Sequence, residues 1–449
     1  MLKDPLREKL KDLMEKGILE RGLMILDDQL DDIKQLFEHR CIPEHGWTAR
    51  QINFLLTLLS SMDTDKDEAA ARVGEREGRT ASEYVLSLAA GFAHGVGRSG
   101  DISAVQPKAA GGSLLHILAN RVATSLIKGI GLPAVDTSMV LPLASGMSIA
   151  LCLAAIHRAW MEQTPGDPWQ RTEVIYPRVD HKSPLKGIEL AGFRPVVVEG
   201  HLDGDAVIVP VEAVKNSITS KTAAILSTTA FFPPRSTDDI KGIAKLAKDA
   251  GIPHVVNNSY GLQSDAYLKL LRGAMEAGRI DYIVQSTDKN FLTPVGGAVI
   301  CSQFKDRIES VGRSYAGRAT AQPIVQFLAA ALTYGLAGYK KLMVEQKEHR
   351  ATLQKHAENF AGRTGQRVLR VDNPVATAVT LEGLPRDIGG KLYTLRVTGP
   401  RAVFPGEFGS CIDTYPVAYM TLNAGIGAKR EDLDRVGEKM EKLASQLKL

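Results

Sequence analysis

Residues 281–302 read DYIVQSTDKNFLTPVGGAVICS, and this stretch decides the fold. It contains two short apolar runs of the kind that form buried strands, the first ending at Ser286 and the second starting at Gly297. Lys289 lies between them, three residues after the first run. In an open α/β sheet, ligands bind in the crevice beyond the carboxyl ends of the strands. Lys289 is therefore a candidate for cofactor chemistry, and a lysine in a surface turn is the alternative.

Strand-like and helical segments alternate around this stretch. From about residue 136, VLPL is followed by the helical SGMSIALCLAAIHRAW, and TEVIYP is followed by PLKGIELAG. The alternation continues through PHVVNNS and YLKLLRGAMEAG. Such a rhythm is typical of an α/β fold, a mostly parallel sheet with helices on both faces. We expect this large cofactor-binding α/β domain to span residues 131–319.

Segments of another character flank the predicted α/β domain. Residues 4–40 place apolar side chains at steps of three and four, which indicates a helix, and we assign residues 1–130 to an N-terminal helical extension. After residue 320 the chain has one or two long helical stretches, two strand-like pieces and a closing amphipathic helix from Arg430 to Leu449. This pattern predicts a small C-terminal α+β domain over residues 320–449.

Composition limits the classes of function. The 55 basic and 51 acidic side chains give a net charge of +4, which is no independent sign of a nucleic-acid partner. Cys41, Cys152, Cys301 and Cys411 are far apart and form no CxxC pair, so we expect neither disulfides nor a metal site. The N-terminus is charged, and no apolar run has the length of a membrane span. We therefore expect a cytoplasmic protein without a membrane partner.

A second strand end has features that suit a phosphorylated cofactor. In LASGMS, residues 143–148, a strand passes into a helix through Ser145, Gly146 and Met147. Free backbone N–H groups at a helix N-terminus bind anions. Neither GxxxxGK[ST] nor GxGxxG occurs in the chain, so a nucleotide loop is not supported. We expect this turn to hold the cofactor phosphate, and an ordinary β–α turn is the alternative.

Two more strand ends suit the ring of pyridoxal phosphate, which a lysine amine holds as a Schiff base. HVVNNSYG, residues 254–261, ends in polar residues at the place where such enzymes usually carry an aspartate against the pyridine nitrogen. Here that residue is Asn257, an amide, which predicts a weaker electron sink that suits elimination at Cβ better than full transamination. His181, in YPRVDHKS, could lie on or beside the ring, and a purely structural histidine is an equal alternative.

The glycine-rich stretch at residues 97–112 offers a second phosphate site. It contains Arg98, Ser99, Gln106 and Lys108 among glycines. Arginine makes bidentate contacts to phosphate, while hydroxyl, amide and backbone N–H groups add neutral donors. A second phosphate site would mean a phosphorylated substrate, and a basic surface loop is the alternative.

These motifs together resemble one known family. GEREGR at 74–79, GRSGDISAVQPKAAG at 97–111, SGMS, VNNSYG, VQSTDKNFLTPVGGA and the GRA at 317–319 are similar to the O-phosphoseryl-tRNA(Sec) selenium transferase family, from about residue 40 to 430. The resemblance implies a fold-type I pyridoxal-phosphate transferase. It also implies conversion of phosphoseryl-tRNA(Sec) to selenocysteinyl-tRNA(Sec) with selenophosphate, by β-elimination of phosphate and addition of selenium. The family is a homotetramer, a dimer of dimers in which two subunits shape each site.

The resemblance also implies roles for individual residues. Lys289 would bind the cofactor and remove the Cα proton, Asn290 would contact the cofactor, and Arg76 would contact the cofactor phosphate from a neighbouring subunit. The phosphoryl group of the substrate would be gripped by Arg98, Ser99, Gln106 and Arg318. Glu75 would repel a free α-carboxylate and so favour the esterified tRNA substrate over free phosphoserine.

Three residues would contact the tRNA if the resemblance holds: Arg401, Arg40 and His39. One departure is Glu276, which stands at a position that is basic in some relatives, with Arg272 and Arg279 nearby. That departure puts part of the tRNA contact in doubt.

Other functions remain open at this point. A cysteine desulfurase or selenocysteine lyase needs a reactive cysteine, for which Cys411 is the candidate, and it would leave the second phosphate site without a purpose. A sulfur-transferring phosphoseryl-tRNA enzyme shares substrate and cofactor. A tRNA-binding scaffold that has lost catalysis is the alternative outside enzymes, and the intact surroundings of Lys289 argue against it.

Overall fold

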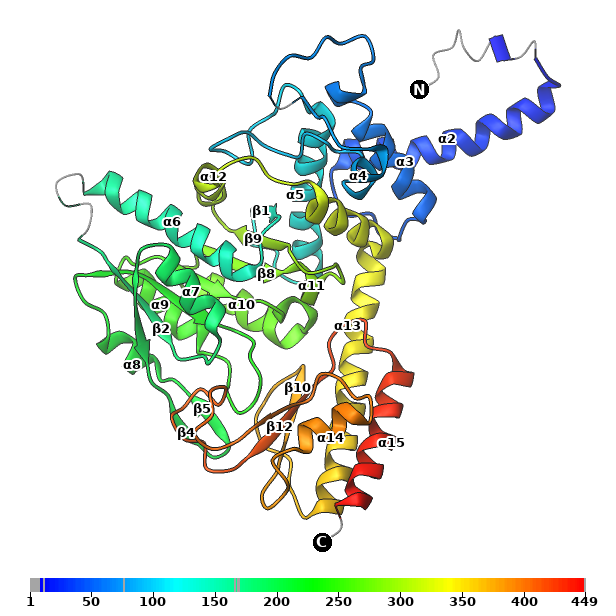
Figure 1. Cartoon of the computed structure of the whole chain (residues 1–449). Helices are drawn as coiled ribbons and strands as arrows, with labels where there is room; N and C mark the ends of the chain where they lie inside the picture. Colours follow the sequence, from blue (N-terminus) through cyan, green and yellow to red (C-terminus); the bar gives the residue numbers. More distant parts are fainter. Residues whose placement is uncertain (1–8, 11–12, 76, 165–166, 168–169, 448–449) are drawn as a thin grey trace.

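The computed structural model describes residues 9–10, 13–75, 77–164, 167 and 170–447. Figure 1 shows three regions: a central sheet with flanking helices, an N-terminal helical region on one side of it, and a small domain at the C-terminus. Several helices, such as α6 (Ser145–Gln163) and α5 (Ala110–Ile130), bury apolar side chains along their length. The arrangement places the carboxyl ends of the central strands close to the small domain.

The central sheet has seven strands in the order β1-β9-β8-β7-β6-β2-β3. The five strands from β8 to β3 are parallel, whereas β9 runs antiparallel to both of its neighbours. This confirms the predicted mostly parallel sheet. The strands are β1 (Thr137–Leu141), β2 (Glu173–Pro177), β3 (Arg194–Val198), β6 (Thr222–Thr228), β7 (His254–Asn257), β8 (Tyr282–Ser286) and β9 (Ala298–Ser302).

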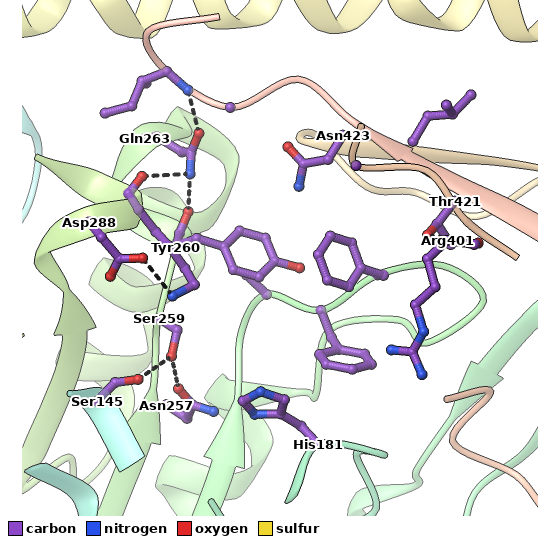
Figure 2. A pocket seen from close by; sticks show the side chains of 18 residues that line it. Ser145, His181, Asn257, Ser259, Tyr260, Gln263, Asp288, Arg401, Thr421 and Asn423 are labelled. Carbon is purple, nitrogen blue, oxygen red and sulfur yellow. Dashed lines mark hydrogen bonds and ion pairs between the residues drawn. The ribbon is translucent and has the colours of Figure 1, made fainter. Parts of the chain in front are cut away.

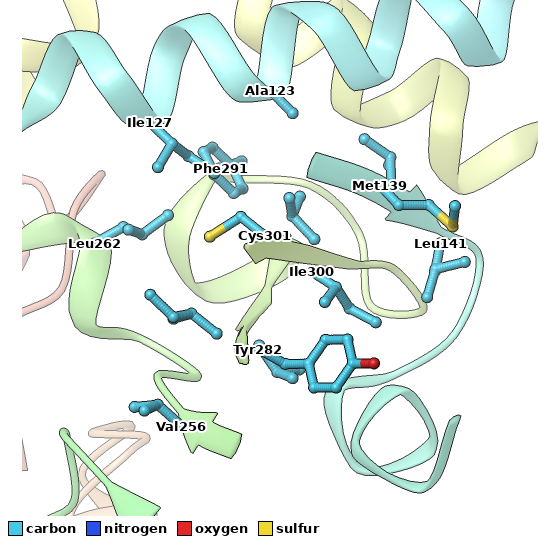
Figure 3. Packing of buried hydrophobic residues seen from close by; sticks show 14 of the residues in the cluster. Ala123, Ile127, Met139, Leu141, Val256, Leu262, Tyr282, Phe291, Ile300 and Cys301 are labelled. Atoms are coloured by element: carbon cyan, nitrogen blue, oxygen red, sulfur yellow. The ribbon is translucent and has the colours of Figure 1, made fainter. Parts of the chain in front are cut away.

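Helices pack on the sheet because each turns an apolar side toward it. Helix α6 packs against α7 and α12, and α9 packs against α8 and α10. Figure 3 shows Ile127 of α5 and Met139 of β1 in the core together with Tyr282 and Cys301 of neighbouring strands, all of them buried. These helices are α7 (Lys182–Leu190), α8 (Val211–Asn216), α9 (Ile240–Asp249), α10 (Asp265–Ala277) and α12 (Lys305–Ser314).

The N-terminal region begins with a helix that extends away from the body of the molecule (Figure 1). This helix, α2, spans Lys16–His39. Residues 9–10 are also helical but residues 13–15 are not, so the predicted helix over residues 4–40 is interrupted; residues 1–8 and 11–12 lie outside the described part. The helix leaves Ile18 and Met24 largely exposed. The region continues through α3 (Ala49–Ser60), η1 (Thr64–Lys66) and α4 (Glu83–Leu88) into α5.

Two helical segments joined at Gly335, together α13 (Gln322–Thr364), connect the sheet region with the small domain. The chain kinks at Gly335, whose φ of 62° is a left-handed conformation that favours glycine. The backbone groups freed at the kink bond to an N-terminal segment: Trp47 N–H donates to Leu332 O, while Pro43 O and Glu44 O accept from the next turn of the helix. The kink explains why the sequence pattern fits either one helix or two.

The small domain has its own sheet, in the order β10-β12-β11, with all pairs antiparallel. Its elements are β10 (Ala376–Thr380), α14 (Ile388–Thr394), β11 (Arg401–Val403), β12 (Tyr419–Asn423) and α15 (Arg430–Gln446). Helix α15 packs on the second half of α13 and encloses a separate apolar core with it. The predicted closing helix is therefore confirmed.

Some elements differ from the sequence pattern or escape it. Residues 287–290, expected as part of a turn, form the one-turn helix α11 (Thr287–Asn290) that carries Lys289. A short hairpin, β4 (His201–Asp203) with β5 (Ala206–Ile208), and the 3-10 helix η2 (Gly261–Gln263) show no clear sequence signal. Within the described residues, no helix has both the length and the apolar character that a membrane crossing requires.

Candidate active site

A cavity of about 470 Å³ lies at the carboxyl ends of the central strands, where the sequence predicts a ligand site. One wall comes from the ends of β7 and β8 and the start of α6, and the opposite wall comes from the small domain (Figure 2). Its size is within the range of small-molecule sites. Of the predicted site residues, it brings together Ser145, His181, Asn257, Lys289 and Arg401.

Lys289 lies on the cavity wall, at the end of α11, with about half of its side chain exposed. Its Nζ is 3.1 Å from Asp288 Oδ2 and 3.4 Å from Ser286 Oγ. Asn290, predicted to touch the cofactor, is instead fully buried and does not line the cavity. Its Nδ2 donates to Ser259 O at 2.8 Å and to Ser286 O at 2.9 Å, and its Oδ1 accepts from Leu262 N–H at 3.1 Å. Asn290 therefore holds the turn that positions Lys289.

The N-terminus of α6 opens onto the same cavity through Ser145. The first backbone bond of this helix runs from Ser148 N–H to Ala144 O at 3.0 Å, so the N–H groups of residues 145–147 precede the helical bonding pattern. Gly146 packs closely on α7, because a Cβ there would lie 2.1 Å from Ser183 Oγ. The backbone N–H groups of residues 145–147 are thus placed as an anion-binding role requires, and the contact with a phosphate stays a prediction.

Asn257 ends β7 and lies almost fully buried at the wall of the cavity. Its Oδ1 accepts a hydrogen bond from Ser259 Oγ at 2.6 Å, and Ser259 Oγ is 3.4 Å from Ser145 Oγ. Figure 2 shows the Asn257 amide nitrogen on the side where His181 lies. An amide, not a carboxylate, is therefore the polar group at this strand end.

An aromatic wall closes the cavity beside His181. The His181 ring lies 6.2 Å from Phe231, which is followed by Phe232 and, 5.7 Å further on, by Tyr260. Burial lowers the pKa of His181 below its usual value, and the positive charges of Lys289 and Arg401 lower it further. This direction favours the neutral imidazole of His181 at neutral pH.

The small domain reaches the cavity through Arg401, Asn423 and the turn at Gly425 and Ile426. Arg401 donates to Phe408 O at 2.9 Å. Ile426 N–H donates to Gln263 Oε1 at 2.8 Å, which ties the small domain to the turn after β7. The family resemblance predicts a tRNA contact for Arg401, and the structure adds that this arginine lines the same cavity as Lys289.

A buried carboxylate fixes a loop of the small domain beside His181. Asp180 Oδ2 accepts from Gly409 N–H at 2.9 Å and from Cys411 N–H at 3.0 Å. Its Oδ1 accepts from Arg178 Nε at 3.0 Å, and Arg178 also pairs with the exposed Asp413 at 2.6 Å. Asp180 is 4% exposed, so its bonds are shielded from water.

The predicted second phosphate site lies elsewhere in the chain. Val96 and Ala319 pair through two backbone bonds, which bring the loop of Arg98 and Ser99 beside Arg318. Gln106 bonds within its own loop, where its Oε1 accepts from Lys108 N–H. None of the described members of this group lines the cavity of Lys289.

A second cavity, of about 330 Å³, is lined by Glu75, His94 and Arg318 among others. Arg318 donates to His94 O in its wall. The structure therefore places the predicted filter residue Glu75 beside a residue of the predicted phosphate site, and both away from Lys289. The prediction for Arg76 concerns a residue outside the described part of the chain.

The residues predicted to contact tRNA lie at the end of the extended helix and on the small domain. His39 and Arg40 are exposed at the end of α2, and His39 lines a cavity of about 530 Å³. Glu276 is exposed on α10, while Arg279 pairs with the buried Asp281 at 2.8 Å. Arg279 is thus engaged inside the protein.

The candidate thiol of the desulfurase alternative is inaccessible. Cys411 is fully buried, and burial raises the pKa of its thiol to about 12. Its Sγ accepts from Asp180 N–H at 3.2 Å, and the residue does not line the cavity. A thiolate nucleophile needs exposure and a lowered pKa, so Cys411 does not suit that role.

Sequence reasoning missed part of the cavity wall. Phe231 and Phe232 follow the end of β6, so the rule that sites lie at strand ends could have found them. Tyr260 and Gln263 follow β7 in the same way. Asn423 comes from the small domain, and no sequence signal connects it with this site.

The fold and this cavity define a pyridoxal-phosphate enzyme of fold type I, because a lysine, a helix N-terminus and a polar strand end converge at the carboxyl edge of a mostly parallel sheet. The chain belongs to the O-phosphoseryl-tRNA(Sec) selenium transferase family, whose model matches residues 62–445.

Individual relatives agree with this membership. The selenium transferase of Methanopyrus kandleri is 43% identical over 439 residues, which cover 96% of this chain and 99% of that protein. The one from Caenorhabditis elegans is 34% identical over 90% of this chain and 87% of its own. The crystal structure of an archaeal member aligns with a TM-score of 0.90 at 39% identity, over 96% of this chain and 98% of the other.

More distant structures share only the fold. A sphingosine-1-phosphate lyase from Burkholderia pseudomallei aligns with a TM-score of 0.61 at 14% identity, over 97% of this chain and 91% of the other. A rice enzyme solved with pyridoxal phosphate and tryptamine aligns with a TM-score of 0.59 at 13% identity, over 96% of this chain and 98% of the other.

Proposed function

We propose that this protein converts O-phosphoseryl-tRNA(Sec) to selenocysteinyl-tRNA(Sec), with pyridoxal phosphate bound at Lys289. Family membership supports the reaction. The observation that carries the proposal is the convergence of Lys289, Asn257 and the α6 N-terminus on one cavity. A scaffold protein without catalysis would have no use for this arrangement.

The residues present fit the cofactor. The N–H groups at 145–147 suit its phosphate, the Asn257 amide suits its ring nitrogen, and the neutral imidazole of His181 suits its ring face. Asp288 Oδ2 lies 3.1 Å from the Lys289 amine and orients it, and this amine would join the cofactor. When bound, pyridoxal phosphate supplies an electron sink for loss of the Cα proton and of the phosphate at Cβ.

The residues of the chain then handle protons and charge. Lys289 Nζ takes the proton from Cα of the phosphoseryl group and returns it to Cα at the end of the reaction. Phosphate leaves from Cβ with the electrons of the broken C–O bond, and a selenium nucleophile adds at the same carbon. Selenophosphate is the proposed donor, and its own phosphate is lost by hydrolysis. Because His181 stays neutral, it adds no charge beside Lys289.

The second phosphate site is proposed to serve another copy of the chain. Arg98, Ser99, Gln106 and Arg318 do not line the cavity of Lys289 in the same chain. Large apolar side chains stand exposed near them, among them Val73 and Val105. Contact with another copy of the chain would bury these side chains. A homotetramer in which these residues complete the cavity of a neighbour accounts for both observations, and Arg76 would act in the same way on the cofactor phosphate.

The remaining predicted residues are proposed to select the tRNA substrate. Glu75 lies exposed beside Arg318, where its charge would repel a free α-carboxylate. His39 and Arg40 stand at the end of the extended helix, and Arg401 stands at the cavity, positions that suit the acceptor arm and its terminal nucleotide. We also propose a cytoplasmic location, which the four free cysteines support, since thiols persist in reducing compartments.

The test is conversion of phosphoseryl-tRNA(Sec) by the purified full-length protein with selenophosphate, followed by identification of the aminoacyl product. Lys289→Ala should abolish both product and the visible absorbance of the bound cofactor. Lys305→Ala, at an exposed lysine on α12, is the matched control and should retain both. Cofactor binding without any turnover of the tRNA substrate would exclude the proposed reaction. No cofactor band in the wild-type protein would support the scaffold alternative.

Substrate choice and donor can be separated in the same assay. Free phosphoserine should react poorly, and Glu75→Gln should improve its turnover relative to that of the tRNA substrate. Equal turnover of both substrates by the wild-type protein would remove the filter role. A sulfur donor in place of selenophosphate tests the sulfur-transferring alternative, which predicts cysteinyl-tRNA as the preferred product.

A further inference from the structure

The Asn257 amide is fixed in one of its two possible orientations. Its backbone is held in the sheet, where Asn257 O accepts from Thr229 N–H at 3.1 Å, and the side chain is 5% exposed. A half-turn of the amide would exchange the oxygen and the nitrogen without changing its shape. The group that Asn257 offers to the cavity therefore depends on which neighbour binds the other end of the amide.

That neighbour is Ser259, and the hydrogen-bond distance identifies which atom of the Asn257 amide its hydroxyl contacts. The Ser259 Oγ to Asn257 contact is 2.6 Å, within the usual range for O–H···O bonds and shorter than N–H···O bonds. The other acceptor for this hydroxyl, Ser145 Oγ, is 3.4 Å away, which is a weak contact. Ser259 therefore donates its proton to Asn257 Oδ1, and Asn257 Nδ2 turns to the cavity, as Figure 2 shows.

Ser259 itself is held by the turn that carries the lysine. Its backbone oxygen accepts from Asn290 Nδ2 at 2.8 Å and from Ser286 N–H at 3.2 Å. Asn290 is fully buried and all of its side-chain polar groups bond within the protein. One network thus links the residue after Lys289 to the orientation of the Asn257 amide.

We propose that Ser259 is a positioning residue that makes Asn257 a hydrogen-bond donor, and so keeps the ring nitrogen of the bound cofactor free of a proton. A donor N–H can bond only to an unprotonated ring nitrogen, whereas an exposed Oδ1 would favour the protonated one. A neutral ring nitrogen draws fewer electrons from Cα. That suits loss of phosphate from Cβ and disfavours exchange of the amino group. The inference rests on the proposed function, because it requires pyridoxal phosphate at Lys289.

The experiment uses the full-length holoenzyme reconstituted with pyridoxal phosphate labelled with ¹⁵N in the ring. The nitrogen resonance and the absorbance of the cofactor are followed against pH for the wild type, Ser259→Ala, Ser259→Thr and Asn257→Asp. The wild type and Ser259→Thr should show an unprotonated ring nitrogen. Ser259→Ala should raise the ratio of protonated to unprotonated ring nitrogen by up to roughly tenfold at a given pH, which corresponds to the free energy of one ordinary hydrogen bond. Asn257→Asp should protonate the ring nitrogen, and this variant serves as the reference for the fully protonated state.

A further variant separates this role from a loss of structure. Ser145→Ala removes the other neighbour of the hydroxyl, and it should weaken cofactor binding while leaving the state of the ring nitrogen unchanged. A ring nitrogen in Ser259→Ala that titrates like the wild type would overturn the proposal, and so would one that is already protonated in the wild type. Failure of the wild type to bind the cofactor would instead overturn the proposed function itself.

Discussion

Replacement of Asp180 tests whether its buried carboxylate holds the small domain beside the active site. Asp180→Ala leaves the N–H groups of Gly409 and Cys411 without their acceptor in a site shielded from water. Each buried donor left unsatisfied costs about 1–3 kcal/mol, so the variant should lose roughly 2–6 kcal/mol of local stability. Arg178 keeps its pairs with Glu199 and Asp413, so its charge adds little to the loss.

The assay is hydrogen exchange at the 409–411 amides, together with the urea midpoint of the whole protein. A loss of 2 kcal/mol corresponds to roughly thirtyfold faster exchange at these amides, since about 1.4 kcal/mol is a factor of ten. Asp413→Ala is the control: Asp413 is 90% exposed, so its pair with Arg178 should contribute less than about 1 kcal/mol. Exchange in Asp180→Ala no faster than in Asp413→Ala would refute the reasoning.

Three further predictions concern pH, backbone and thiol. Burial lowers the pKa of His254 to about 4, so as the pH falls the unfolded state takes up a proton before the folded state does. The free energy of unfolding should therefore drop by about 3 kcal/mol between pH 6.5 and 4. Urea titrations of His254→Asn should show a smaller drop. In thermal unfolding, Gly335→Ala should destabilise the protein by about 2–4 kcal/mol, because the new Cβ would lie 2.5 Å from a backbone carbon and the residue has a φ of 62°. Gly362 lies in α13 with no atom near its Cβ position, so Gly362→Ala should stabilise the protein by up to about 1 kcal/mol. Cys411→Ser should retain selenium transfer in the tRNA assay. Loss of this activity in a folded Cys411→Ser variant would restore the desulfurase alternative.

Much of the large domain could be predicted from the sequence because its signals are local. The alternation of strands and helices indicates the sheet, and the ends of its strands carry Ser145, Asn257 and Lys289 into one cavity. In a parallel sheet these ends lie at one edge whatever the length of the connections. The roles of these residues remain predictions, but their convergence is a property of the fold.

The rest of the site could not be predicted because it depends on distant parts of the chain. Arg401 and Asn423 reach the cavity from the small domain, more than a hundred residues beyond Lys289. Asn290 has the residue type of a ligand contact, yet its surroundings turn it into a buried support for the turn. The loop of Arg98 meets Arg318 through a backbone pairing that no spacing in the sequence reveals.

The kink in α13 couples two regions that look independent in Figure 1. The segment between α2 and α3 supplies Pro43 O, Glu44 O and Trp47 N–H to the broken turn at Gly335, and beyond that turn the helix carries the small domain. A displacement of α2 must therefore either break these hydrogen bonds or change the angle of α13 at Gly335. If binding at α2 changes the affinity of the cavity for its ligand by some factor, binding in the cavity changes the affinity at α2 by the same factor. For a substrate long enough to contact both α2 and the cavity, binding at one place would then affect binding at the other.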